Sequence, residues 1–338
     1  MSRSKNASVA IVGSETAIGR ELRERLIDSG LARDVQLIGA EDEISGIITE
    51  LDGEPVVMTP LDADRLNSSN IVFCAGSPVS TRKAFSLAGS TQQPYIVDLS
   101  YALEEQPEAR LRAPCIEPAD AKPADAIHVL AHPAAVAVAV VLTRVHSKFA
   151  VRHSVIHVFE PASERGQAGM NELQQQSTGL LSFQTLNKAV FDAQAGFNML
   201  PRYGEDAPER LQDVEARIER HTATLLGGYG VPVPSIRLIQ APVFHGYSMS
   251  FWIEFESRPS VAQLSEALAS NFVEIRDADL EPPTNVGAVG QDGLAAGLIE
   301  PDRNHSTAMW MWVAADNFRL LVDNAIAVAR ELESKERA

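Results

Sequence analysis

The sequence predicts an α/β chain built from a parallel-sheet domain and a following α+β domain, with the last helix returning to the first domain. Three observations support this prediction. Apolar strand-like runs alternate with helical patterns over the first 130 residues, as in βαβ units. Beyond about residue 150, apolar and polar residues alternate as in antiparallel strands. The chain then ends in a long amphipathic helical pattern.

The elements of the first half follow in order. A buried strand over 8–13 leads into a helix over 16–30, in which Gly30 is expected to end the helix. A crossover helix is predicted over 79–90. Segment 134–149 is rich in alanine and begins after a proline, so a buried helix is favoured there over a strand. Four further strands are predicted at 34–40, 70–76, 94–100 and 126–131.

The second half is expected to hold strands at 152–161 and 235–256, in a mixed or antiparallel sheet, and helices at 167–178, 209–226 and 260–271. The tail helix begins at Asp316, and its apolar stripe needs a neighbour, which we expect to be the first domain. The stripe consists of Phe318, Leu321, Val322, Ala325, Val328, Ala329 and Leu332. The predicted domains are therefore 1–133 together with 313–338, and 134–312.

Composition excludes several classes of protein. A formal net charge of −16 argues against binding to nucleic acid, which needs clustered Lys and Arg. No apolar run is long enough to span a membrane, and the N-terminus lacks a signal-peptide pattern, so we expect a cytoplasmic protein without a membrane partner. Two cysteines, Cys74 and Cys115, give neither a disulfide framework nor metal-ligand spacing, and the eight histidines show none either, so no metal is predicted.

The turn after the first strand carries two glycines, Gly13 and Gly19, in "VGSETAIG". Glycines at such a strand-to-helix turn let a dinucleotide pyrophosphate approach the backbone amides. A tight connection that needs glycine for steric reasons alone is an equally good interpretation. Glu41 or Asp42, after the next strand, could bond a ribose and would repel a 2′-phosphate, which favours NAD over NADP. A solvated acidic turn is the favoured interpretation of that pair.

Seven stretches, in order, resemble one family across nearly the whole chain: "VGSETAIG", "FCAGSPVS", "YIVDLSYAL", "LAHPAAVAV", "FNMLPRYG", "APVFHGYS" and "WVAADNFR". They resemble the aspartate-β-semialdehyde dehydrogenases. The resemblance implies a Rossmann-type domain that binds NAD or NADP, a dimerisation and substrate domain, and a homodimer. It also implies the cofactor contacts, which are Gly13, Thr16, Ala17, Ile18, Gly19, Ala75, Gly76 and Ser100.

The family's chemistry uses a thiolate nucleophile, a His acid/base, an orienting Gln in "Q-A-V-S-G" and an Arg that clamps the substrate carboxylate. The motifs align these four positions with residues of other chemical types. The arginines that hold phosphate in the family are also replaced in this alignment. One aligns with Glu104, and a pair near the C-terminal end aligns with Leu298 and Glu300. No catalytic residue is therefore predicted, and the chain resembles Usg-type paralogues that lack the cysteine. The four vacated catalytic positions are Ala135, Glu160, Gln240 and Tyr247.

Three function hypotheses remain. The leading one is a homodimeric family member that keeps the fold, and with it NAD(P) binding, without the thiol chemistry. The alternative is an active NAD(P)-dependent aspartate-semialdehyde dehydrogenase of amino-acid biosynthesis. A third is a structural partner that forms mixed dimers with a true family enzyme. Cys115 could replace the nucleophile, but an inert thiol is the favoured interpretation. His132 could act as a new base, but a satisfied loop histidine is favoured there.

Overall fold

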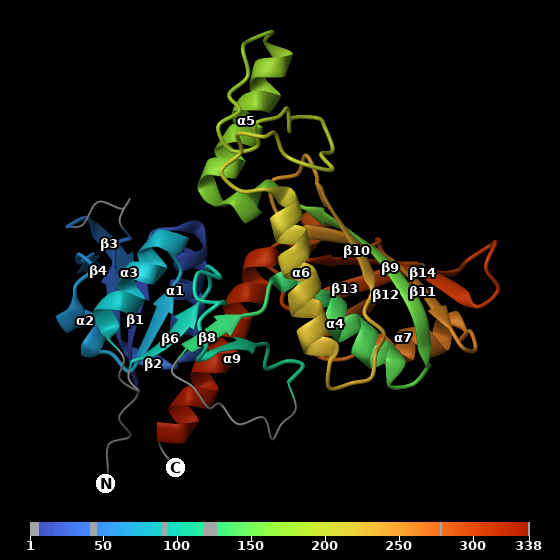
Figure 1. Cartoon of the computed structure of the whole chain (residues 1–338), viewed down its shortest axis with the longest axis horizontal. Helices are drawn as coiled ribbons and strands as arrows, with labels where there is room; N and C mark the ends of the chain where they lie inside the picture. Colours follow the sequence, from blue (N-terminus) through green and yellow to red (C-terminus); the bar gives the residue numbers. More distant parts are fainter. Residues whose placement is uncertain (1–6, 41–45, 90–93, 118–126, 278, 337–338) are drawn as a thin grey trace. The chain divides into compact units, whose positions relative to one another are not determined.

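The computed structural model describes residues 7–40, 46–89, 94–117, 127–277 and 279–336 (Figure 1). The chain divides into two compact units, residues 1–131 with 321–338, and residues 132–320. The first unit holds a six-stranded sheet in the order β2-β1-β5-β6-β8-β7, in which every neighbouring pair is parallel. Its strands are β1 (Ala7–Val12), β2 (Ala32–Ile38), β5 (Ile71–Cys74), β6 (Tyr95–Asp98), β7 (Ala109–Arg112) and β8 (Ile127–Leu130).

Helices cover both faces of this sheet, because successive residues of its buried strands point to opposite sides. On one face, Ile11 and Phe73 share a core with α1 and α9. On the other, Val12 and Cys74 pack with α2 and α3. The four helices are α1 (Ala17–Ser29), α2 (Ala63–Asn67), α3 (Pro78–Ala88) and α9 (Asn317–Glu336). The prediction of a parallel-sheet domain is confirmed.

The tail helix α9 packs where its apolar stripe predicted. From Leu321 to Leu332 its apolar side chains join the core that holds β1, β5 and α1, whereas Phe318, the first residue of the predicted stripe, lies outside that core with its ring 4.6 Å from that of His245. The expected end of α1 is also confirmed, because Gly30 adopts a left-handed conformation after the last helical residue. A hairpin of β3 (Ile48–Leu51) and β4 (Glu54–Val57), with strand β7 and helix α2, was not predicted from the sequence.

The second unit is built on a mixed six-stranded sheet in the order β10-β9-β11-β14-β13-β12. Helices α4, α6 and α7 pack on one face of it (Figure 1). The strands are β9 (Val151–Glu160), β10 (Ser235–Gln240), β11 (Tyr247–Phe255), β12 (Val273–Arg276), β13 (Leu294–Pro301) and β14 (Ala308–Ala315). The helices are α4 (Pro133–His146), η1 (Ala162–Arg165, a 3₁₀ turn), α5 (Gly166–Leu181), α6 (Leu211–Leu226), α7 (Val261–Leu268) and α8 (Asn285–Ala288).

The sheet is mixed, one of the two expected forms. Segment 235–256 forms two strands, of which β11 pairs antiparallel with β9 and β10 pairs parallel with it. The long connection through α5 and α6 is the kind of crossover that a parallel pair needs. The ambiguous segment after Pro133 is a helix, α4, and its side chains are buried from Pro133 to Val141. None of the described helices is long and apolar enough to cross a membrane.

Candidate functional site

The glycine turn of the first unit brings the ends of β1 and β5 into direct backbone contact. Gly13 has a φ of +82°, and a Cβ there would lie 2.4 Å from the Cα of Gly76. A Cβ on Gly19 would lie 2.1 Å from the carbonyl oxygen of Gly13. Steric demand alone therefore explains why these three positions are glycine. Glycines at a strand-to-helix turn also let a phosphate approach the backbone amides at the start of the helix that follows.

Thr16 caps α1 and links the turn to β5. Its Oγ1 accepts a hydrogen bond of 2.9 Å from the Gly19 amide and lies 2.8 Å from the carbonyl oxygen of Ala75. Ala17 and Ile18 form the first turn of the helix. Nearby, the Ser14 hydroxyl is buried, and no hydrogen-bond partner for it lies among the described residues. A buried donor beside an uncovered helix N-terminus fits a phosphate oxygen, so these residues fit a dinucleotide pyrophosphate.

Ser100 follows β6, the next strand of the sheet. Its hydroxyl donates to Asp98 Oδ1 at 2.8 Å and lies 2.9 Å from Thr81 Oγ1. Burial raises the pKa of the Asp98 carboxyl against the hydrogen bonds from Ser100 and Leu103, which lower it. Ser100 is thus held by the protein itself. The acidic pair Glu41 and Asp42 lies outside the described residues.

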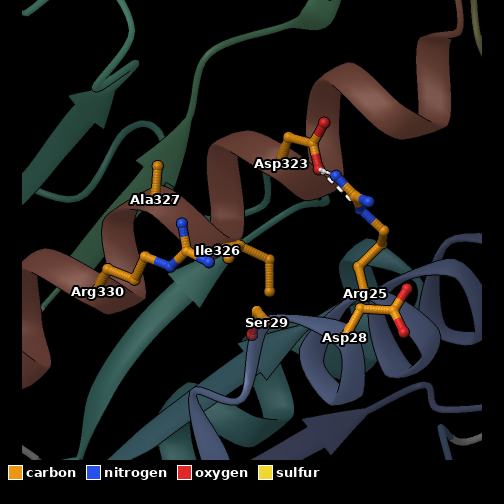
Figure 2. Close-up of a pocket in the computed structure, with 7 residues that line it drawn as sticks. All are labelled: Arg25, Asp28, Ser29, Asp323, Ile326, Ala327 and Arg330. Atoms are coloured by element: carbon orange, nitrogen blue, oxygen red, sulfur yellow. Dashed lines mark hydrogen bonds and ion pairs between the residues drawn. The ribbon is translucent and has the colours of Figure 1, made fainter. Parts of the chain in front are cut away.

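Figure 2 shows a separate cavity of the first unit, of about 260 Å³, between α1 and α9. Arg25 and Asp323 close one side of it with a 2.6 Å ion pair. Asp28 and Ser29, which also line it, belong to the last turn of α1. The glycine turn lies at the other end of this helix, so the cavity is not part of the candidate dinucleotide site.

In the second unit, the expected nucleophile position lies at the start of α4. Ala135 is fully buried in the first turn, two residues after Pro133. His132 caps this helix through a 3.3 Å bond from the Ala134 amide to its Nδ1, and its own amide donates to His221 Nδ1 at 2.9 Å. Burial, with smaller effects from His221 and nearby arginines, holds the pKa of His132 well below its usual value. His132 is therefore a neutral, satisfied capping residue.

Two of the other predicted positions, Glu160 and Gln240, meet directly. Both are fully buried at the ends of β9 and β10. The Gln240 amide donates to the Glu160 backbone carbonyl at 2.9 Å. The Tyr203 hydroxyl lies 2.7 Å from Gln240 Oε1 and 3.0 Å from Glu160 Oε1. Arg165 donates to the same Glu160 oxygen at 2.7 Å, and its other nitrogen pairs with Glu209.

Tyr247, the fourth predicted position, begins β11 and is fully buried. Its ring lies 6.4 Å from that of His132, and its hydroxyl is one of the groups that lower the pKa of Glu164. The Asn317 amide donates to Glu164 at 2.7 Å, and His132 Nε2 lies 3.7 Å from Glu164. Burial and then the charge of Glu160 raise the pKa of Glu164 to about 7, against the opposing effect of Arg165. This cluster joins the N-terminus of α4 to η1 and β11.

The sequence reasoning missed Glu164, Arg165 and Tyr203. The signal for Glu164 was in the family pattern itself, since the small final residue of "Q-A-V-S-G" aligns with it. Nothing in the pattern indicated that Tyr203 would reach Glu160. Of the two thiols, Cys74 is buried in β5 and Cys115 is exposed after β7 in the first unit. Among the described residues, no group of three or more His, Cys, Asp or Glu could hold a metal ion.

Comparison with known proteins agrees with this architecture. Residues 142–320 match the family model described as "Semialdehyde dehydrogenase, dimerisation domain". An aspartate-semialdehyde dehydrogenase of Rickettsia bellii is 26% identical over 97% of this chain and 98% of its own length. A USG-1 protein homolog of Azotobacter vinelandii is 27% identical over 92% of this chain and 93% of its own length. The structure of a probable aspartate-semialdehyde dehydrogenase from Pseudomonas aeruginosa superposes with a TM-score of 0.85 at 24% identity, covering 99% of this chain and 100% of that one.

Proposed function

Since this chain belongs to the semialdehyde dehydrogenase family, we propose that it is a homodimeric member that retains the dinucleotide-binding fold but does not carry out thiol-dependent semialdehyde oxidation. The match to the family model over 142–320 establishes the membership. The proposal concerns the chemistry, and it rests on the residues that stand where the family's reacting groups are expected.

One observation carries the proposal: the buried network of Glu160, Gln240, Tyr203 and Arg165. Gln240 stands where the resemblance expects the substrate-clamping Arg. Its Nε2 donates to the backbone carbonyls of Glu160 and Ala241, and its Oε1 accepts from the Tyr203 hydroxyl. Arg165 is tied to Glu160 and Glu209 and so is not available as a substitute clamp. Most polar atoms at this site therefore bond one another instead of a substrate, although Glu160 Oε2 is buried with no hydrogen-bond partner among the described residues.

The charges of the site also oppose the family's substrates. Glu160 and Glu164 lie close enough that the first raises the pKa of the second. The raised pKa of Glu164 shows that a second negative charge beside Glu160 is unfavourable in this buried region, and the charge of an anionic substrate would meet the same repulsion. At the nucleophile position, the Ala135 methyl group cannot attack a carbonyl carbon. Binding and covalent chemistry are both opposed by these residues.

The glycine turn supports a bound dinucleotide. Gly13, Thr16 and Gly76 would surround its pyrophosphate, and the Ser14 hydroxyl would bond a phosphate oxygen. When bound, the nicotinamide supplies a hydride acceptor. An aspartate semialdehyde dehydrogenase from Candida albicans, solved with NADP, superposes with a TM-score of 0.67. We propose that NAD binds this chain more tightly than NADP, because Glu41 and Asp42 would repel a 2′-phosphate. Calorimetric titration with each dinucleotide tests this, and tighter NADP binding would refute it.

The homodimer is proposed to form through the face of the second sheet that points away from α4, α6 and α7. Trp312 and Phe159 stack on this face with ring centroids 5.8 Å apart. They line an apolar hollow of about 160 Å³ with Met199 and Val243, and Met199 is 56% exposed. Apolar side chains gathered on an open sheet face are typical of an isologous dimer contact.

The central test is NADP-dependent oxidation of aspartate semialdehyde in phosphate buffer by the purified chain. We expect no turnover, since losing a covalent nucleophile removes several powers of ten in rate. The variant Ala135→Cys alone should also be inactive. The fourfold variant Ala135→Cys, Glu160→Gln, Gln240→Arg, Tyr247→His is the minimum that could regain turnover. Wild-type oxidation that is lost when Cys115 or His132 is replaced would overturn the proposal.

The alternative function is an active aspartate-semialdehyde dehydrogenase. Nearly full-length similarity to curated enzymes of that name, such as the one from Rickettsia bellii, favours it. The same assay separates the two, because only the alternative expects turnover by the wild-type chain.

A further inference from the structure

Three side chains outside the expected family chemistry form a continuous hydrogen-bonded line in the second unit. Ser163 Oγ lies 2.9 Å from His245 Nδ1, and His245 Nε2 lies 2.9 Å from Asp316 Oδ1. Ser163 comes from η1, His245 from the turn between β10 and β11, and Asp316 from the residue before α9. Three separate elements thus converge on one histidine ring.

The proton positions in this line follow from the partners. An ionised Asp316 only accepts, so the His245 Nε2 that faces it carries the ring proton. Burial raises the pKa of Asp316, but hydrogen bonds from His245 and from backbone amides prevail and hold it below its usual value. The other ring nitrogen, Nδ1, is then a bare acceptor, and the Ser163 hydroxyl can donate to it. Asn317 meets the serine oxygen as well: its Nδ2 lies 3.1 Å away and its Oδ1 3.3 Å away, so Oδ1 is a second, longer acceptor for the Ser163 proton.

A purely structural role explains part of this arrangement. Asp316 accepts from the amides of Phe318, Arg319 and Gly290, which starts α9 and holds the loop after α8. These contacts need the aspartate but not the histidine. His245 is 19% exposed in its side chain, whereas the serine it meets is 1% exposed. A half-buried imidazole between a buried hydroxyl and a buried carboxylate is the arrangement that activates a serine.

We propose that Ser163, His245 and Asp316 form an acyl-transfer site that hydrolyses small uncharged esters. This activity goes beyond the proposed function, because it needs neither a thiol nor a dinucleotide. The ring nitrogens are exchanged relative to serine proteases, where Nδ1 faces the aspartate, but the roles of the three groups are the same. The catalytic residues are Ser163 and His245, and Asp316 positions the ring.

The reaction balances without a co-reactant other than water. Ser163 Oγ bonds to the ester carbonyl carbon while its proton passes to His245 Nδ1. The ester C–O bond breaks, and the leaving alkoxide takes that proton, which gives an alcohol and an acyl-serine. Water then attacks the acyl carbon, transfers a proton to Nδ1, and releases the acid as the proton returns to Ser163.

Burial and charge define the substrate class. Ser163 is 1% exposed and the His245 side chain 19%, so a substrate has to displace the edge of the imidazole to reach the hydroxyl, and we expect only small acyl groups to react. Glu164 follows Ser163 directly and accepts from the same Asn317. An anionic acyl group would meet this carboxyl, so an uncharged ester is favoured over a charged one.

The test uses the full chain and a small fluorophosphonate, followed by mass spectrometry of the peptide that contains Ser163. We expect a covalent adduct on Ser163 in the wild type and none in His245→Gln. Hydrolysis of p-nitrophenyl acetate should fall roughly a hundredfold or more in Ser163→Ala and His245→Gln. The matched control is His153→Gln, because His153 is an exposed histidine paired with a single carboxylate, and it should keep the full rate.

The wild-type labelling keeps the proposal falsifiable even if the variants fold poorly, since it needs no substitution. An unlabelled Ser163 in folded wild-type protein, or ester hydrolysis that Ser163→Ala leaves unchanged, overturns the proposal. Neither result bears on the absence of semialdehyde oxidation, which is measured with a different substrate and cofactor.

Discussion

Replacing Arg165 by Met should destabilise the second unit strongly, because it strands the buried carboxylate of Glu160. Glu160 is fully buried, and Arg165 donates to its Oε1 at 2.7 Å. Removing one partner of a buried ion pair typically costs about 3–5 kcal/mol, since the remaining charge is left without compensation. With a denaturant slope of about 2 kcal/mol per molar, a loss of 3 kcal/mol lowers the urea midpoint by about 1.5 M.

The assay can be confined to this unit. All three tryptophans, Trp252, Trp310 and Trp312, lie in its sheet, so intrinsic fluorescence reports its unfolding. Adding Glu160→Gln to the Arg165 variant should restore most of the lost stability, because an amide needs no counter-charge and still accepts from Tyr203. The matched control is Arg202→Met, since this exposed arginine should tolerate the change.

The reasoning is refuted if Arg165→Met lowers the free energy of unfolding by less than about 1 kcal/mol, the range of an exposed ion pair. It is equally refuted if the double variant is no more stable than Arg165→Met, because the cost would then not come from the stranded carboxylate.

Three further outcomes are expected. The urea midpoint of the wild type should fall relative to that of Glu164→Gln as the pH rises from about 5 to 8. The reason is that the folded chain keeps the Glu164 proton up to about pH 7, while the unfolded chain releases it near its ordinary pKa. A difference between the two midpoints that stays constant over this pH range would contradict the reasoning. Gly13→Ala should destabilise the first unit by about 2 kcal/mol or more in circular dichroism melts. The loss should exceed that of Gly30→Ala, because Gly30 also has a positive φ but has open space around it. Equal losses in the two variants would argue against the clash with Gly76. Trp312→Glu should shift light scattering from a dimer to a monomer near 36.6 kDa, and a monomeric wild type would reject the dimer.

The sequence by itself determined the alternation of strands and helices in the first unit, the helical end of the chain and the family. These follow from local signals: the apolar period, the glycine that ends α1, and motif order. The stripe from Leu321 to Leu332 predicted that α9 needs a neighbour, and the core it joins is the one expected. Motif order also predicted four positions at which the family's chemistry has changed type, and this stays a prediction.

Only the tertiary structure decided how those positions are satisfied. Parallel pairing of β9 and β10 places Glu160 opposite Gln240, although 80 residues separate them in the chain. Tyr203 and Arg165 complete their hydrogen bonds from a loop and from η1, and no periodic pattern encodes such contacts. The line from Ser163 through His245 to Asp316 arises in the same way, because each of its three residues looks ordinary where it stands in the sequence. Local sequence fixes which elements form, whereas the partner of a buried polar group depends on which distant elements meet.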